Sequence, residues 1–235
     1  MEAETEPQLS VWDHIGELRS RLLKAMGALV ITTAASFFGL ASYALDFLAG
    51  PVGGLENLVA IEVTESVGVY MRIALLSGFI IALPLIVYQI LAFVVPGLYE
   101  NEKRWLFSAI PIATLLFIAG VAFSYFVMLP AALPFLLGFL DVQAMVSINR
   151  YIQFVTNMMF WIGVAFETPL VVFILAKLNI VTPSMLLKQW RFAVVIIALI
   201  AAMITPTVDP VNMGLLMLPL FAIYMLSVLF AKLAK

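Results

Sequence analysis

The sequence has no cysteine among its 235 residues and only one histidine, His14. Disulfides, thiol nucleophiles and thiolate metal sites are therefore excluded, and a lone histidine cannot build a metal site. The chain also lacks a phosphate-binding G-x-x-x-x-G-K-[ST] loop, a G-x-S-x-G motif and an H-E-x-x-H motif. We therefore expect no cofactor, no metal and no enzymatic step, and any work that the protein does must be powered from elsewhere.

Charge is scarce as well. Charged residues make up 11% of the chain against 64% hydrophobic residues, and the mean hydropathy is +1.13. Globular proteins average about 45–50% apolar and about 25% charged residues, so this composition indicates a polytopic membrane protein. The net charge of −2 is too small to suggest nucleic acid as a partner.

The apolar runs predict a single membrane domain over residues 1–235, all α-helical, in which residues 1–9 form a flexible tail. Prolines inside four of the spans should bend their helices and curve the bundle. The expected spans are approximately 22–45, 68–94, 105–129, 151–176, 191–204 and 211–230.

The basic residues predict how these six spans are oriented. Of the 12 Lys and Arg residues, only Arg72 and Arg150 fall on one side of the alternating scheme, which leaves ten on the side shared by both termini. Because Lys and Arg concentrate in cytoplasmic loops, both termini should be cytoplasmic. The fifth span, from Gln189 to Ile204, would reach only ~24 Å, so it either thins the bilayer locally or continues through its polar flanks.

Two acidic residues precede the first span at a helical spacing. Asp13 and Glu17 lie one turn apart, on a helix that Ser10 or Asp13 can cap. Stacked carboxylates favour a cationic ligand. The alternative is a solvated helix entrance in which Arg21, a further turn along, pairs with Glu17 for only ~0.3–0.5 kcal/mol.

Glu167 is the most unusual residue within a span. It lies about ten residues, or ~15 Å, from the cytoplasmic end of the fourth span, near the bilayer midplane. A carboxylate there indicates a water-lined concavity or a proton-responsive site, or else a protonated side chain bonded to a neighbouring helix. Pro169 lacks the N–H that would bond to the carbonyl of Ala165, so the helix should kink beside Glu167.

Five segments resemble one known family in order and at the same topological depth, over about Trp12 to Phe230. They are 14–22 (HIGELRSRL), 84–104 (PLIVYQILAFVVPGLYENEKR), 123–126 (FSYF), 166–169 (FETP) and 205–210 (TPTVDP). The chain thereby resembles the TatC family, the multispanning receptor subunit of the twin-arginine protein translocase.

The resemblance implies a cytoplasmic docking site for twin-arginine signal peptides, made of Glu17, Arg19 and Glu102 with Phe93 at the membrane edge. Two carboxylates from different loops can distinguish a pair of arginines from lysines, because guanidinium groups bind carboxylates bidentately. Arg19 lies about 200° around the helix from Glu17, so we expect it to orient this helix or meet headgroups rather than face the same ligand.

The same resemblance assigns Glu167 and Gln89 as intramembrane functional residues, and Pro51 and Asp209 to outer loops needed for assembly or transport. One position departs from the family, which usually has Tyr-Glu near the end of the sixth span, where this chain has Tyr224 followed by Met225.

The resemblance also implies the function. The chain would bind Arg-Arg signal peptides of folded cargo proteins in the prokaryotic plasma (inner) membrane, with single-span TatA-like and TatB-like partners in an oligomeric complex, driven by the protonmotive force. The alternatives are a proton- or cation-coupled small-solute transporter that uses Glu167, and a structural membrane assembly factor without peptide affinity.

Overall fold

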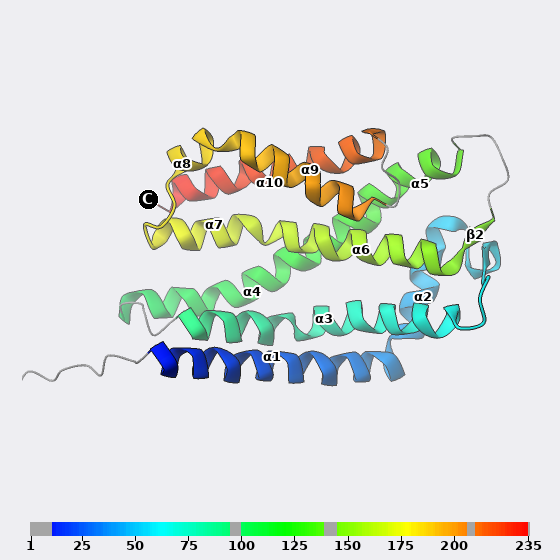
Figure 1. Cartoon of the computed structure of the whole chain (residues 1–235), viewed down its shortest axis with the longest axis horizontal. Helices are drawn as coiled ribbons and strands as arrows, with labels where there is room; N and C mark the ends of the chain where they lie inside the picture. Colours follow the sequence, from blue (N-terminus) through cyan, green and yellow to red (C-terminus); the bar gives the residue numbers. More distant parts are fainter. Residues whose placement is uncertain (1–10, 95–99, 139–144, 206–209, 235) are drawn as a thin grey trace, which may run out of the picture.

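The computed structural model describes residues 11–94, 100–138, 145–205 and 210–234, so the expected tail over residues 1–9 lies outside the described chain. Helices form most of it (Figure 1). In chain order the α-helices are α1 (Val11–Gly39), α2 (Ala41–Ala49), α3 (Glu65–Val94), α4 (Glu100–Phe123), α5 (Leu129–Gly138), α6 (Ile148–Phe166), α7 (Thr168–Lys177), α8 (Pro183–Lys188), α9 (Trp190–Ile204) and α10 (Pro210–Leu233).

Five helical segments are long and apolar enough to cross a membrane, and α9 is a shorter apolar helix of 15 residues. The five are His14–Gly39, Glu65–Phe93, Phe107–Gly138, Ile148–Lys177 and Met213–Leu233. The start of α1 and the end of α10 lie at the same end of the bundle (Figure 1). The expected architecture of six helical spans with both termini on one side is therefore confirmed.

The first helix differs from its expected bounds. α1 begins at Val11 and ends at Gly39, and after Leu40 the chain continues as α2 rather than as the expected straight span to Leu45. α2 runs at an angle to α1 across the outer end of the bundle (Figure 1). Its residues Ala41 and Leu48 are buried in the core, so burial of apolar surface favours the turn over a continuous helix.

The third span extends beyond its expected end at Leu129. A π-helical segment, Ser124–Met128, joins α4 to α5, so the helical path continues to Gly138. In a π-turn each N–H bonds to the carbonyl five residues earlier instead of four, as the N–H of Leu129 does to the carbonyl of Ser124. Pro130, which has no N–H to donate, follows directly in the first turn of α5.

The fourth span is divided at Glu167. α6 ends at Phe166 and α7 begins at Thr168, with Pro169 in the first turn of α7. The expected kink beside Glu167 is therefore confirmed. Ser147, a residue type that favours helix N-termini, precedes the expected fourth span and so predicts its N-cap. The structure confirms this cap, since the Ser147 hydroxyl accepts a hydrogen bond from the backbone N–H of Arg150 at 3.4 Å.

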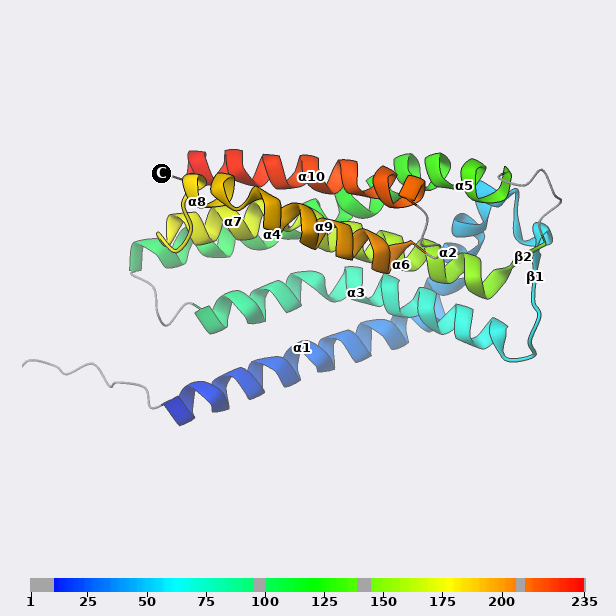
Figure 2. The ribbon, with the colours of Figure 1, turned by 45° about the horizontal axis from the view of Figure 1, so that its top comes forward.

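Small residues set how closely the helices pack. Figure 2 shows α1 at one edge of the bundle, with α3 between it and the other helices. A Cβ on Gly78 of α3 would lie 2.6 Å from the Cα of Thr33 in α1, so these two backbones are in direct contact. Thr32 also donates a hydrogen bond to the carbonyl of Gly78 at 2.8 Å. A similar contact joins Gly120 of α4 to Gly163 of α6, at 2.9 Å from a Cβ to a Cα.

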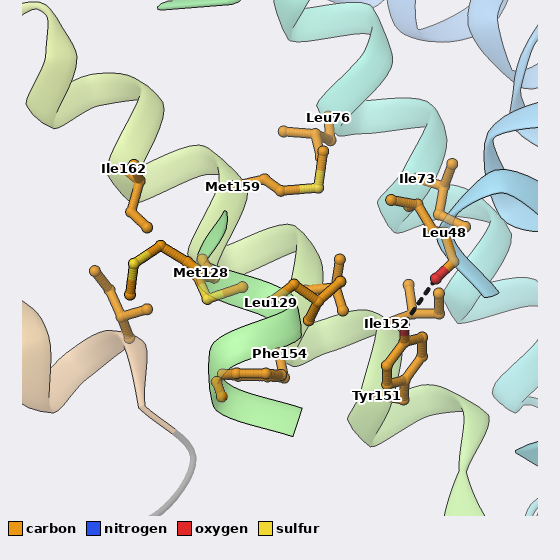
Figure 3. Packing of buried hydrophobic residues seen from close by; sticks show 14 of the residues in the cluster. Leu48, Ile73, Leu76, Met128, Leu129, Tyr151, Ile152, Phe154, Met159 and Ile162 are labelled. Atoms are coloured by element: carbon orange, nitrogen blue, oxygen red, sulfur yellow. Dashed lines mark hydrogen bonds between the residues drawn. The ribbon is translucent and has the colours of Figure 1, made fainter. Parts of the chain in front are cut away.

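The outer half of the bundle holds the main core. Figure 3 shows buried side chains of α3, α5 and α6 packed together, with Tyr151 beside Leu48 of α2. The Tyr151 hydroxyl donates to the carbonyl of Leu48 at 2.7 Å, and Tyr125 donates to the carbonyl of Phe47 at the same distance. Two tyrosines thus hold α2 in place through its backbone.

A short parallel pairing closes the outer end. β1 (Leu58–Val59) follows the 3-10 turns η1 (Gly50–Val52) and η2 (Leu55–Asn57), and it pairs with β2 (Val146–Ser147). Glu65, 8% exposed, joins the same region. Its carboxylate accepts from the backbone N–H of Ile61 at 2.8 Å and from the Ser147 hydroxyl at 3.4 Å. The segments that precede α3 and α6 are therefore joined both by the β1–β2 pairing and by the hydrogen bond from Ser147 to Glu65.

Candidate functional site

The cytoplasmic ends of α1 and α3 meet through an aromatic contact. The rings of His14 and Phe93 stack with their centroids 4.4 Å apart and an angle of 23° between the planes. Glu17 lies one turn along α1 from His14, with 4.0 Å between the His14 Nδ1 and the Glu17 Oε2. Two of the four expected docking residues, Glu17 and Phe93, are thus brought to one corner, with His14 between them.

Glu17 has a partner within its own helix. The Nε and one terminal nitrogen of Arg21 donate to the Glu17 Oε1, at 2.9 Å and 2.6 Å. The structure thus contains the Glu17–Arg21 pair that the sequence left open as an alternative. Both side chains are about one quarter exposed, so the pair is accessible to water and to ligands.

The other two expected docking residues are Arg19 and Glu102. Arg19 is exposed, two residues beyond Glu17 on α1 and thus on a different face of the helix. Glu102 lies in the first turn of α4, which begins at the end of the bundle where α3 ends (Figure 1). Its backbone is therefore at the cytoplasmic end, while its side chain lies outside what the structure describes.

The two intramembrane candidates share one property. Glu167, at the break between α6 and α7, and Gln89, in α3, each have a buried side-chain oxygen, Oε1, with no hydrogen-bond partner among the described residues. A buried acceptor without a donor costs free energy, so such groups call for an explanation. The observation fits a polar function within the membrane, but it does not join the two residues into one site.

The outer-loop candidate Pro51 lies at the opposite end of the bundle. Pro51 lies in the 3-10 turn η1 after α2, and it lines a hollow of about 440 Å³ together with Tyr125 and Pro134. Gly53 and Gly54 follow with φ of 87° and 109°, a backbone that strongly favours glycine. Asp209 lies outside the described residues.

Several structural features were missed from the sequence. His14 appeared only as a residue unable to hold a metal alone, yet it stacks on Phe93; its place in the turn before Glu17 was the available signal. Glu65 is a buried acid that looks like an ordinary loop residue in the sequence. Among the described residues, no group of three or more His, Cys, Asp or Glu side chains could hold a metal ion.

Six apolar helices define a multi-pass integral membrane protein, and the partly exposed Glu17–Arg21 pair lies at their cytoplasmic end. A family profile described as Sec-independent protein translocase protein (TatC) matches residues 13–219. The chain belongs to this TatC family, so it is a component of Sec-independent protein translocation in the plasma (inner) membrane.

Individual relatives agree over nearly the whole chain. The TatC of Carboxydothermus hydrogenoformans is 36% identical over 230 residues, covering 97% of this chain and 94% of the relative. That of Deinococcus radiodurans is 38% identical over 230 residues, covering 94% and 85%. A crystal structure of the twin arginine translocase receptor TatC matches with a TM-score of 0.84 at 36% identity, covering 94% of this chain and 99% of that one. The expected family resemblance is confirmed.

Proposed function

We propose that this chain is the signal-peptide receptor and core subunit of a twin-arginine protein translocase. It binds the Arg-Arg motif of cargo signal peptides at the corner formed by Glu17, Phe93 and the first turn of α4 with Glu102, while Arg19 orients the start of α1. The observation that carries this proposal is the Glu17 carboxylate, about one quarter exposed and held beside the stacked rings of His14 and Phe93.

The chemistry of arginine supports this site. A guanidinium group donates several hydrogen bonds in one plane and can engage a carboxylate with two of them, whereas a lysine ammonium acts as a point charge. The aromatic rings add a surface over which a guanidinium can stack. Two carboxylates from separate elements would therefore select an adjacent pair of arginines.

The remaining parts of the proposal follow from the family. The receptor works with single-span TatA-like and TatB-like subunits in an oligomeric complex, passes folded proteins across the membrane and is driven by the protonmotive force. It performs no enzymatic step of its own. Near the C-terminal end of α10, Tyr224 donates to the carbonyl of Leu186 at 2.7 Å, so it ties α10 to α8 even though Met225 replaces the usual glutamate.

Peptide binding tests the proposal directly. A fluorescent twin-arginine signal peptide is titrated against the purified, detergent-solubilised chain, with a twin-lysine peptide as control, at two salt concentrations. We expect arginine-selective binding that weakens as salt rises, because exposed charges are screened. The double variant Glu17→Ala with Glu102→Ala should lose this binding while remaining folded, whereas Glu62→Ala, which removes an exposed acid at the other end of the bundle, should retain it. Retained affinity in the folded double variant would overturn the site.

A second candidate function rests on Glu167, whose Oε1 is buried without a partner among the described residues. Under this alternative the chain would be a proton- or cation-coupled small-solute transporter. Solute flux into proteoliposomes that is abolished by Glu167→Gln would favour it. A chain without peptide affinity and without flux would instead be a structural assembly factor.

A further inference from the structure

A cavity inside the bundle has one polar end. It measures about 370 Å³ and lies between α1, α3 and α6. Arg72 and Asn157 supply its charged and amide groups, while Leu29, Phe79 and Phe160 line the rest. This volume falls in the range of ~300–1,000 Å³ that small-molecule ligands occupy in proteins.

The polar end of the cavity faces the outer leaflet. α3 has 30 residues and so is ~45 Å long, about 15 Å longer than the hydrocarbon core of a bilayer. Arg72 lies about two turns, or ~10 Å, from Glu65 at the outer end of α3. Its guanidinium is therefore near the outer headgroups. Phe79 lies another ~10 Å deeper. The cavity therefore runs from a cationic mouth to an apolar interior.

Arg72 has no counter-charge in the part of the chain that the structure describes. Among the described residues, the ion pairs all lie at Glu17, and no hydrogen bond joins Arg72 to a neighbour. The hydroxyl of Thr156, which also lines the cavity, is already used, because it donates to the carbonyl of Ile152 at 2.6 Å. A half-buried arginine at the edge of the hydrocarbon core is stabilised by an anion that accepts hydrogen bonds from its guanidinium.

We propose that this cavity binds one phospholipid of the outer leaflet. The lipid phosphate pairs with the Arg72 guanidinium and the Asn157 amide, and one acyl chain enters between Leu29, Phe79 and Phe160. Phosphate suits the guanidinium because its oxygens accept two parallel hydrogen bonds. Leu75, half exposed beside Arg72, leaves a side of the cavity open to the surrounding lipid. This site is separate from the proposed peptide site, so either can fail without the other.

Native mass spectrometry of the delipidated chain in detergent tests the proposal. The probes are phosphatidylglycerol, a diacylglycerol with the same acyl chains, and glycerol phosphate alone. We expect one phosphatidylglycerol per chain, and at least about tenfold weaker binding of the other two, since each lacks one half of the interaction. Equal binding of the diacylglycerol would show that Arg72 is not used, and equal binding of glycerol phosphate would show an anion site without an acyl chain; either result overturns the proposal.

Variants locate the lipid within the fold. Arg72→Gln should weaken phosphatidylglycerol binding about tenfold or more, and Arg72→Lys less, because lysine keeps the charge but not the fork of donors. Leu29→Trp should also weaken binding by filling the apolar end. The control is Arg150→Gln, which removes the exposed arginine of the same outer side and should leave binding within about twofold. Unchanged binding in folded Arg72→Gln would refute the site.

A photo-crosslinker at Leu75 in native membranes separates the lipid from a polypeptide occupant. A crosslinked mass that corresponds to a phospholipid supports the proposal. A crosslink to a signal peptide or to a partner helix would assign the cavity to protein contacts and overturn it. Peptide binding at the cytoplasmic corner is measured in parallel, so loss of one site is not mistaken for loss of the other.

Discussion

Arg21 contacts Glu17 through only one of the two carboxylate oxygens. Both of its hydrogen bonds end on Oε1, at 2.9 Å and 2.6 Å, while Oε2 has the His14 Nδ1 at 4.0 Å, beyond hydrogen-bond distance. The pair therefore fixes the orientation of the carboxylate and leaves one oxygen for a ligand. Glu17 can therefore pair with Arg21 and still bind a ligand.

The first prediction separates these two roles. Glu17→Gln should weaken twin-arginine peptide binding by about tenfold or more, because a hydrogen bond to a charged group is worth ~1.5–3 kcal/mol. Arg21→Gln should change the affinity by less than about threefold, since an i, i+4 helix pair contributes only ~0.3–0.5 kcal/mol. Fluorescence anisotropy of a labelled peptide gives both constants. A larger loss in Arg21→Gln than in Glu17→Gln would contradict the assignment.

The second prediction concerns the contact between α1 and α3. Gly78→Ala should destabilise the protein by about 1–3 kcal/mol, because the new Cβ meets the backbone of Thr33 rather than a movable side chain. Gly68→Ala on the same helix is the matched control, since nothing lies within 4 Å of its Cβ position. Thermal unfolding in detergent should show a lower midpoint for the first variant and an unchanged or higher one for the second. Equal midpoints would show that α1 can shift freely.

The third prediction addresses the attachment of α2. Tyr151, 4% exposed, donates to the carbonyl of Leu48, so Tyr151→Phe leaves a buried acceptor unpaired at a cost of about 1–3 kcal/mol. Tyr43→Phe removes a hydroxyl from a residue that is 74% exposed and should have little effect. Scanning fluorimetry compares the two, and limited proteolysis between Gly50 and Asn57 shows whether the outer turns loosen. An unchanged midpoint in Tyr151→Phe would mean that water replaces the lost donor.

The fourth prediction sets stability against function at Glu167. Because its Oε1 is buried without a partner among the described residues, Glu167→Leu should raise the unfolding midpoint, by about 1–3 kcal/mol in free energy. Export of a twin-arginine reporter by the same variant should fall, while peptide binding at the cytoplasmic corner stays within about twofold. Glu62→Leu, at an exposed position, is the control. A lower midpoint in Glu167→Leu would show that the carboxyl group has a structural partner.

The sequence predicted those features that depend on composition and local chemistry. Apolar length and the positions of basic residues were enough for six spans with both termini on one side. The cap at Ser147 was predictable because a serine hydroxyl can accept a hydrogen bond from the first turn of a helix. The break beside Glu167 was predictable because Pro169 has no N–H to donate. The family followed from five short segments in order. The docking residues that the family implies remain predictions.

Features that depend on tertiary packing could not be predicted. Nothing local distinguishes α2 from a continuation of α1, because the turn after Gly39 is stabilised by burial of Ala41 and Leu48 against α3 and α6, which are far from that turn in sequence. The π-helical segment before Pro130 likewise has no local signal in the sequence, although it shifts the backbone hydrogen bonds around the proline. Arg72 was visible in the sequence as one of two basic residues on the outer side, but the cavity beside it is formed by three helices.

The short helix α9 has an electrical consequence. Its 15 residues reach ~22 Å, about three quarters of the ~30 Å that hydrocarbon usually spans. Where the bilayer thins to match it, the whole membrane potential falls over that shorter distance. The electric field beside α9 is then about one third stronger than in the surrounding membrane, and a charge that crosses there experiences a correspondingly larger force over a shorter path.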